Sequence, residues 1–462
     1  MNNPPPFDAD LLRRYDRPGP RYTSYPTAPQ FTNTFTAQDL RDVIRHSNED
    51  PIPRALSLYV HIPFCVSPCF YCGCNRIITR DFSRGDAYLE HLKKEIAMMA
   101  PLFEKDREVV QLHFGGGTPN FLRPEKIAEL LAFLRQAFNF NTSQDQEISI
   151  ELDPRHVNEE DITALARMGF NRASFGVQDF DPAVQAAVNR IQSVEQTLAV
   201  MNACKAEKFR SVNIDLIYGL PNQNIAGFSK TLDIVTDARP DRIAVYSYAH
   251  MPQLFKPQKQ LDATLLPTGE IKLALLQTAI EKLSQAGYCY IGMDHFALPE
   301  DELARAQASG SLHRNFMGYT THANTDLLGL GVSSISHIGD SFSQNPRDLP
   351  SWEMAIESGR MPIWRGMHLS HDDVVRADLI QQWMCQGEID IAAFETRHDL
   401  DFPSYFREDL KHLQPLAVDG LVEISNKCLR ASSRGRLLLR IIAACFDRYL
   451  STGSVSQFSK TI

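Results

Sequence analysis

Six apolar strand segments that alternate with helical segments constrain the fold of this 462-residue chain more than any other feature. The predicted strands are residues 56–62, 109–114, 147–152, 171–177, 211–219 and 241–248. The predicted helices are residues 86–103, 124–138, 158–168, 193–208, 226–237 and 269–286. Strands that are apolar nearly throughout are typical of a parallel sheet covered on both faces. Short connections predict right-handed crossovers, and therefore an α/β fold with a parallel sheet.

The repeat alone is compatible with either a flat, doubly wound sheet or a barrel. A further apolar segment, residues 288–293, would form a seventh strand or an edge. In a barrel, functional groups gather where several strands end. The polar candidates described below follow the ends of successive strands. They favour a partial (β/α)6 barrel over residues 54–300.

The two flanks of this repeat have different patterns. Residues 1–53 are rich in Pro, Tyr, Thr and Asp without sustained periodicity, which predicts an extended N-terminal arm. Residues 301–365 predict a loop-rich connection that completes the active site. Residues 366–462 predict a mainly helical cap domain, in which a β-hairpin at 420–432 gives a winged-helix-like pattern. Winged helices often bind DNA, but the lack of a basic recognition stripe favours a cap.

Charge and composition exclude several classes of function. The 47 Lys and Arg residues against 56 Asp and Glu give a net charge of −9, which disfavours binding to nucleic acid or an anionic membrane. The sequence has no apolar run of about 18 residues, and its first residues lack a signal-peptide pattern. Gly and Pro are near average usage, so collagen-like and low-complexity classes are excluded. We therefore expect a cytoplasmic protein with neither nucleic-acid nor membrane partners.

Four of the nine cysteines lie within ten residues, directly after the first predicted strand. The spacing Cys65-x3-Cys69-x2-Cys72 lets three thiolates bind three irons of a 4Fe–4S cluster and leaves the fourth iron for an exchangeable ligand. Cys74 lies only two residues after Cys72, so one loop can hardly direct both sulfurs to adjacent corners. A structural zinc site is the alternative, although zinc prefers two separated ligand pairs.

The cysteine spacing, with Tyr71 before the last ligand, resembles the radical S-adenosylmethionine (SAM) superfamily. Within it, the chain resembles the family of oxygen-independent coproporphyrinogen III oxidases along nearly its whole length. The segments that carry this resemblance are residues 19–28, 59–75, 113–122, 147–155, 170–180, 188–192, 213–221, 292–297, 312–321 and 435–450. The related haem chaperones share the barrel and the three cysteines. The Cys-Gly-Cys-Asn segment at 72–75 and the arm motif favour the oxidase.

The resemblance implies a specific reaction and a specific set of partners. Reductive cleavage of SAM would give a radical that takes hydrogen from a propionate of coproporphyrinogen III. Loss of CO2 and one electron would then leave a vinyl group, at two of four propionates, giving protoporphyrinogen IX. The implied partners are an electron donor such as flavodoxin or ferredoxin and, in the absence of an exposed heptad, no second copy of the chain. The alternatives are a haem chaperone or methyltransferase relative, and a zinc-stabilised scaffold.

The resemblance also assigns residues to two SAM molecules. It places the first SAM on Tyr59, Gly116, Glu151 and Ile335. It places a second SAM on Tyr71, Gly117, Thr118, Gln178, Arg190, Asp215 and Ala249. These residue types are suited to the task, because glycines allow close backbone approach and an arginine can bind a carboxylate through two hydrogen bonds.

Three further residues are candidates for direct roles. Tyr59 and His61 are two positions apart, so their side chains point to the same face of the first strand. We expect both to act in catalysis, through contact with the cluster or the substrate. A substrate with four carboxylates needs localised cations in an acidic protein, and Arg21 in the arm is one candidate.

Overall fold

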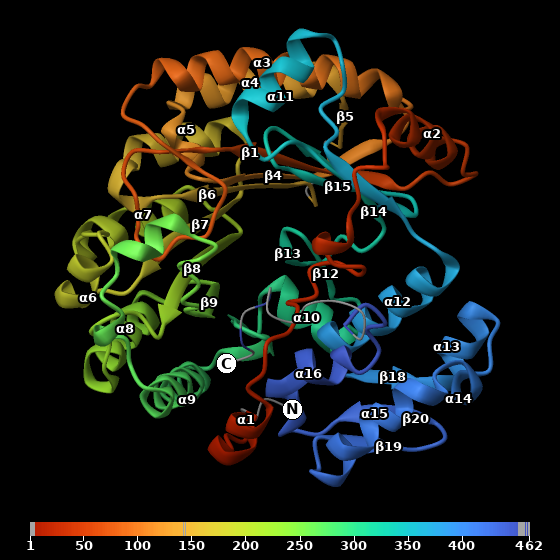
Figure 1. Ribbon diagram of the computed structural model, residues 1–462. Coiled ribbons are helices and arrows are strands. Elements are labelled where there is room, and N and C mark those ends of the chain that lie inside the picture. Colours follow the sequence, from red (N-terminus) through yellow and green to blue (C-terminus); the bar gives the residue numbers. More distant parts are fainter. Residues whose placement is uncertain (1–4, 142, 144, 451–457, 459, 461–462) are drawn as a thin grey trace.

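The computed structural model describes residues 5–141, 143, 145–450, 458 and 460, and a large curved sheet lies at its centre. The six predicted strands are confirmed as neighbouring parallel strands of this sheet. They are β1 (Ala55–Ile62), β4 (Glu108–Gly116), β6 (Glu147–Leu152), β7 (Arg172–Gln178), β8 (Ser211–Tyr218) and β9 (Arg242–Ser247). Figure 1 shows the sheet as an open arc, which confirms the partial barrel.

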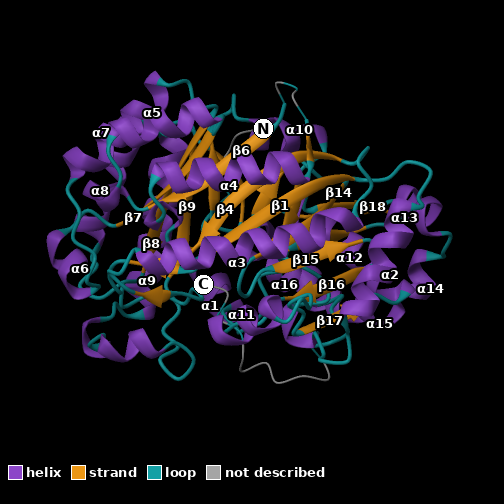
Figure 2. Ribbon diagram, turned by 90° about the horizontal axis from the view of Figure 1, so that it is seen from above, coloured by secondary structure: helices purple, strands orange, loops and turns teal. Residues whose placement is uncertain are grey.

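The six predicted helices are also confirmed. They are α3 (Ser83–Met99), α4 (Pro124–Ala137), α5 (Glu159–Met168), α7 (Val194–Ala206), α8 (Ile225–Ala238) and α9 (Gly269–Gln285). Helix α4 has Pro124 at its first position, and α5 begins with an Asn158 capping box and ends at Gly169 with φ 101°. Figure 2 shows α3 and α4 lying across the strands. A short helix, α6 (Pro182–Ala187), is additional to the prediction.

The segment predicted at 288–293 is an edge and not a seventh parallel strand. Strand β10 (Cys289–Gly292) pairs antiparallel with β11 (His295–Ala297), which pairs antiparallel with β9. The parallel part of the sheet therefore ends at β9 on this side.

The prediction that residues 301–365 are loop-rich is wrong. Strand β14 (Thr325–Leu330) pairs in parallel with β1, so the sheet continues past its first strand. It is followed by antiparallel strands β15 (Ile335–Ile338), β16 (Ser341–Gln344) and β17 (Arg365–His368). The segment also forms helices α10 (Glu302–Ser309) and α11 (Leu349–Glu357) and a hairpin of β12 (His313–Asn315) and β13 (Gly318–Thr320). These strands are short and contain glycine or serine, so the sequence shows no continuous apolar run that would predict them. Gly329 is needed because a β-carbon there would lie 2.5 Å from the backbone oxygen of Ile335.

The prediction of a wholly extended arm is wrong in two places. Helix α1 (Ala9–Tyr15) and helix α2 (Ala37–Asn48) both lie within it, and α2 begins with a capping box. Between them the chain runs from α1, beside the C-terminal domain, past the β12–β13 hairpin to α2 (Figure 1). Tyr22 and Tyr25 are buried in the core of that domain, and Arg440 Nε donates to the carbonyl of Pro20 at 3.0 Å. The arm is therefore packed into the fold.

The C-terminal domain is mainly helical and has the predicted hairpin. Its helices are α12 (His371–Cys385), α13 (Ile391–His398), α14 (Phe402–Tyr405), α15 (Arg407–Val418) and α16 (Leu439–Ala444). The hairpin of β19 (Val422–Ile424) and β20 (Cys428–Ala431) is joined by β18 (Glu388–Asp390) in a three-stranded antiparallel sheet, and the winged-helix-like description of this domain remains a prediction. No helix in the described part of the chain is long and apolar enough to cross a membrane. The predicted boundaries of the four domains remain predictions.

Candidate active site

The three predicted ligand cysteines lie in one loop at the carboxyl end of β1. Cys65 ends the short strand β2 (Phe64–Cys65), which pairs in parallel with β3 (Ile77–Ile78) and so closes the loop at its base. Cys65 and Cys69 are buried, Cys72 is half-buried, and all three thiols are free. One short loop thus presents three reduced sulfurs near the mouth of the barrel.

Polar groups from other strands donate to these sulfurs. The Thr118 hydroxyl donates to Cys65 Sγ at 3.2 Å. Arg190 Nη1 donates to Cys69 Sγ at 3.5 Å, and Arg155 Nη2 lies 3.8 Å from the same sulfur. Cationic and hydroxyl donors of this kind stabilise thiolates, which are the form that binds iron. The surroundings of the loop therefore fit a cluster with negatively charged ligands.

The surroundings of Cys72 favour its thiolate, whereas burial raises the pKa of the Cys65 thiol to about 11. Hydrogen bonding with the Cys74 thiol lowers the pKa of Cys72 to about 6 against the opposing effect of burial, and Arg76 contributes to the same shift. The Cys74 amide also donates to Cys72 Sγ at 3.4 Å. Cys74 thus supports Cys72 in this structure, and its exclusion from the ligand set remains a prediction.

The geometry of the loop disfavours the zinc alternative. Among the described residues, no three or more His, Cys, Asp or Glu side chains are grouped to hold a single metal ion. Structural zinc needs four ligands around one point. The thiolates of a 4Fe–4S cluster bind separate irons and need not meet at one point.

The glycine segment after β4 packs tightly against β1. A β-carbon on Gly116, at φ 119°, would lie 2.7 Å from the His61 ring, and one on Gly117 would lie 2.8 Å from the backbone of the cysteine loop. The Gly116 amide donates to Glu151 Oε2 at 3.2 Å, and the Gly117 amide donates to the backbone of β1. Both amides are therefore used within the protein.

The pKa values of two carboxylates inside the barrel shift in opposite directions. Glu151 and Asp215 line a polar cavity of about 160 Å³. Burial raises the pKa of Asp215 to about 6, and the charge of Glu151 adds to this shift, despite hydrogen bonds from Asn213 and Ser174. Burial also opposes ionisation of Glu151, but hydrogen bonding with His113 and the Gly116 amide, together with further electrostatic contributions, outweighs burial and lowers the pKa of Glu151. The barrel interior therefore holds one ionised carboxylate beside one that takes up a proton more readily.

Tyr59 and His61 lie on the same face of β1, as predicted. The Tyr59 hydroxyl and His61 Nδ1 are 3.1 Å apart, and His61 Nε2 lies 3.0 Å from the carbonyl of Asn75. Burial lowers the pKa of His61, so the ring is neutral near pH 7. Because a carbonyl only accepts, the ring proton sits on Nε2, and Nδ1 accepts from Tyr59. His61 thus connects β1 to the end of the cysteine loop.

Arg190, in the loop after α6, and Gln178, at the end of β7, are both buried. Arg190 contacts Asp153 at 3.3 and 3.4 Å, and Arg155 contacts the same carboxylate at 2.6 Å. Within the part of the chain that the structure describes, the buried atoms Arg190 Nε and Gln178 Oε1 have no hydrogen-bond partner. Unpartnered polar atoms beside the cysteine loop fit a polar ligand. Asp153 and Arg155 are absent from the predicted site, although both lie in the motif at 147–155.

The remaining predicted SAM contacts are Tyr71 and Ala249, which lie together, and Ile335, which lies elsewhere in the barrel. Gln258 Nε2 donates to the carbonyls of Tyr71 and Ala249, at 2.9 and 3.2 Å, and brings these two predicted contacts together. Ile335 begins β15, and its backbone passes over Gly329, which pairs with β1. Ile335 therefore lies towards the Tyr59 side of the barrel, as its assignment to the first SAM requires.

This combination of a half-open barrel and a three-cysteine loop defines a radical SAM protein, and the comparisons agree. A family model described as the Radical SAM superfamily matches residues 59–235, and the HemN C-terminal domain matches residues 369–438. Superfamily membership implies a 4Fe–4S cluster and SAM.

Whole-chain relatives identify the family. The chain is 47% identical to the oxygen-independent coproporphyrinogen III oxidase of Pseudomonas aeruginosa over 456 residues, which cover 99% of each chain. It is 49% identical to that of Salmonella typhimurium over 458 residues, 99% of this chain and 98% of the relative. The solved structure of Escherichia coli coproporphyrinogen III oxidase (HemN), described as a radical SAM enzyme, matches with a TM-score of 0.92 and 46% identity, over 97% of this chain and all of that one. The chain is a radical SAM enzyme and belongs to the oxygen-independent coproporphyrinogen III oxidase family.

Proposed function

We propose that this enzyme converts coproporphyrinogen III to protoporphyrinogen IX without oxygen, in haem biosynthesis. Two propionates each lose CO2, one hydrogen atom and one electron, and become vinyl groups. The observation that carries the proposal is identity at 47% over 99% of both chains, which includes the arm and the C-terminal domain as well as the barrel. A shared barrel alone would fit the haem-chaperone alternative equally well.

The residues of this chain hold and orient the reacting groups. When bound, the cluster and SAM supply one-electron chemistry that removes a hydrogen atom. The three ligand cysteines hold the cluster, and Thr118, Arg155 and Arg190 donate towards their sulfurs. Neutral His61 fixes the end of the loop, and Tyr59 donates to its ring. The barrel wall keeps these groups away from bulk water.

The finer assignments are part of the same proposal. The first SAM lies against Tyr59, Gly116, Glu151 and Ile335, and a second lies against Tyr71, Gly117, Thr118, Gln178, Arg190, Asp215 and Ala249. The unpartnered atoms of Arg190 and Gln178 support the second site. The enzyme acts as a cytoplasmic monomer that accepts electrons from a small carrier such as flavodoxin or ferredoxin.

Anaerobic turnover tests the proposed reaction. The reconstituted enzyme is incubated with SAM, a reductant and coproporphyrinogen III, and the products are analysed by mass. The expected result is the loss of two CO2 per tetrapyrrole, with Cys69→Ser as the inactive control. Tetrapyrrole bound without any change in mass would contradict the proposal and favour a chaperone.

A further inference from the structure

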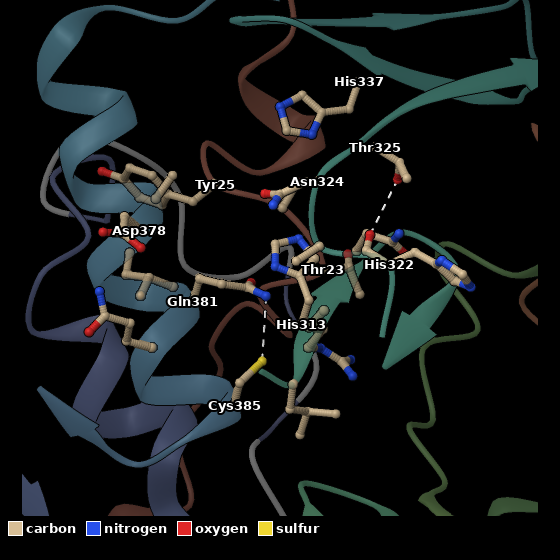
Figure 3. A pocket seen from close by; sticks show the side chains of 18 of the residues that line it. Thr23, Tyr25, His313, His322, Asn324, Thr325, His337, Asp378, Gln381 and Cys385 are labelled. Atoms are coloured by element: carbon tan, nitrogen blue, oxygen red, sulfur yellow. Dashed lines mark hydrogen bonds between the residues drawn. The ribbon is translucent and has the colours of Figure 1, made fainter. Parts of the chain in front are cut away.

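A cavity of about 900 Å³ lies away from the cysteine loop, between the barrel, the arm and the C-terminal domain. Its lining includes Ala55 and Val110, at the amino ends of β1 and β4, whereas the cysteine loop follows the carboxyl end of β1. Figure 3 shows side chains of the arm, the β12–β13 hairpin and α12 around it, among them Tyr25, His313 and Gln381. The volume is in the range of a cavity for a sizeable organic ligand.

Arg314, on β12, lines this cavity and is 5% exposed. Its guanidinium lies over the ring of Tyr319, its partner across the hairpin, at 4.7 Å. Tyr319 lines the cavity inside the barrel, so Arg314 lies where the two cavities approach each other. Among the described residues, none forms an ion pair with Arg314, and its Nε and Nη1 have no hydrogen-bond partner.

Four groups that interact with the charge of Arg314 carry no compensating charge, and the nearby carboxylate of Asp294 is already paired with Arg21. The four groups are His295, Tyr246, Tyr319 and Cys385. Burial, together with the charge of Arg314, lowers the pKa of His295 to about 3, and burial raises the pKa of Cys385 to about 12. All four are neutral near pH 7, and His295 Nδ1 is itself buried without a partner.

Two other buried arginines have carboxylate partners. Arg107 contacts Asp326 at 2.6 Å, and Arg172 contacts Glu302 at 2.5 Å. A buried, unpaired guanidinium is costly, because it has lost its hydration without gaining an anion. Such a cation beside a ligand-sized cavity indicates that the ligand supplies the anion.

We propose that Arg314 anchors one carboxylate of the tetrapyrrole substrate in this cavity, an inference that rests on the proposed function. A carboxylate can accept two parallel hydrogen bonds from a guanidinium, which fixes the orientation of the tetrapyrrole as well as its position. Carboxylates that do not react face other donors of the lining, which include His313, His337 and Gln381. A reacting propionate extends past Arg314 and Tyr319 into the barrel cavity that Glu151 and Asp215 line. Phe316 and Phe342 provide apolar surface for the pyrrole rings.

Anaerobic fluorescence titration of the holoenzyme with coproporphyrin III, the oxidised form of the substrate, tests the inference. We expect Arg314→Gln to weaken binding at least about 30-fold, or about 2 kcal/mol, because the carboxylate loses a buried charged partner. Arg314→Lys keeps the charge but loses the paired geometry, and should be intermediate. Arg397→Gln is the matched control, because Arg397 lines the same cavity but is paired with Asp378 at 2.7 Å. It should weaken binding less than about threefold.

Thermal unfolding of the ligand-free protein separates a binding role from a structural one. Removal of an unpaired buried charge should leave the melting temperature of Arg314→Gln unchanged or raised. Two results would overturn the inference and leave the proposed function intact, provided that the wild type decarboxylates normally. One is that Arg314→Gln binds coproporphyrin within threefold of the wild type. The other is that the Km of Arg314→Gln for coproporphyrinogen is unchanged. A wild-type enzyme that neither binds coproporphyrin nor decarboxylates the substrate would overturn both.

Discussion

Replacing Arg190 with alanine tests the charged cluster beside the cysteine loop. The Arg190 side chain is 8% exposed and contacts the Asp153 carboxylate, the Gly176 carbonyl and Cys69 Sγ. Breaking a buried ion pair from one side costs about 3–5 kcal/mol. Asp153 keeps Arg155 at 2.6 Å, so its charge is not left alone. We therefore expect the lower end of this range, about 3 kcal/mol of unfolding free energy.

A double-mutant cycle in urea measures this coupling under anaerobic conditions. Arg190→Ala, Asp153→Ala and the double variant should show a coupling energy of about 1.5 kcal/mol or more, because the two side chains share a buried contact. Arg210→Ala, at an exposed position, is the control and should change stability by less than about 0.5 kcal/mol.

The same variant tests the second SAM site. Arg190 Nε is the buried guanidinium atom that Asp153 leaves unpartnered, so it is free to bind a carboxylate. Equilibrium dialysis with labelled SAM should give one bound equivalent for Arg190→Ala against two for the wild type. Two equivalents bound by the variant with normal turnover would remove Arg190 from the site. In the double-mutant cycle, a coupling energy below about 0.5 kcal/mol between Arg190 and Asp153 would refute the argument that their contact stabilises the fold.

Three further predictions concern the cluster, the arm and pH. Serine at any of the three ligand cysteines should abolish iron binding and visible absorbance, whereas Cys74→Ser should retain both. Arg21 pairs with buried Asp294 in this structure, so Arg21→Gln should cost about 2 kcal/mol in thermal unfolding near pH 7. Burial raises the pKa of Asp294, but the charge of Arg21 outweighs burial and lowers it. The difference in unfolding free energy between the wild type and Arg21→Gln should therefore shrink as the pH falls below about 4. Burial raises the pKa of Glu95 to about 7, so the wild type should lose up to about 3 kcal/mol as the pH rises from 4.5 through 7, and Glu95→Gln should lack this slope.

The barrel was predictable because its strands are continuous apolar runs with helices between them. The part after residue 300 was not predictable, because strands β14 to β17 have only four to six residues each and contain glycine or serine. Their pairing is set by tertiary contacts, such as the close approach of Gly329 to Ile335, that leave no periodic signal. The arm helix α2 was missed for a different reason. Its start signal, Thr36 with Asp39 three residues later, is visible in the sequence but lies within a polar, proline-rich segment.

The candidate site was also predictable only in part. The cysteine loop was predictable from spacing alone, and its neighbours only from resemblance. Asp153 and Arg155 were missed because a single charged residue after a strand is more often solvated than functional. The structure shows one carboxylate shared by two arginines, and that arrangement depends on Arg190, which lies 37 residues away from Asp153.

Net charge is a poor guide to where this acidic protein binds anions. At an overall charge of −9, long-range attraction for a tetracarboxylate is unfavourable, but salt screens such effects beyond about 10 Å. Cations that are buried are screened much less, and what matters for them is whether a neighbouring carboxylate already neutralises them. Arg155 and Arg190 share a single carboxylate beside the cysteine sulfurs, and Arg314 has none among the described residues. Among the described residues, these two groups of arginines lie at places where the proposed chemistry brings anions: thiolates and SAM at the loop, and propionates in the large cavity.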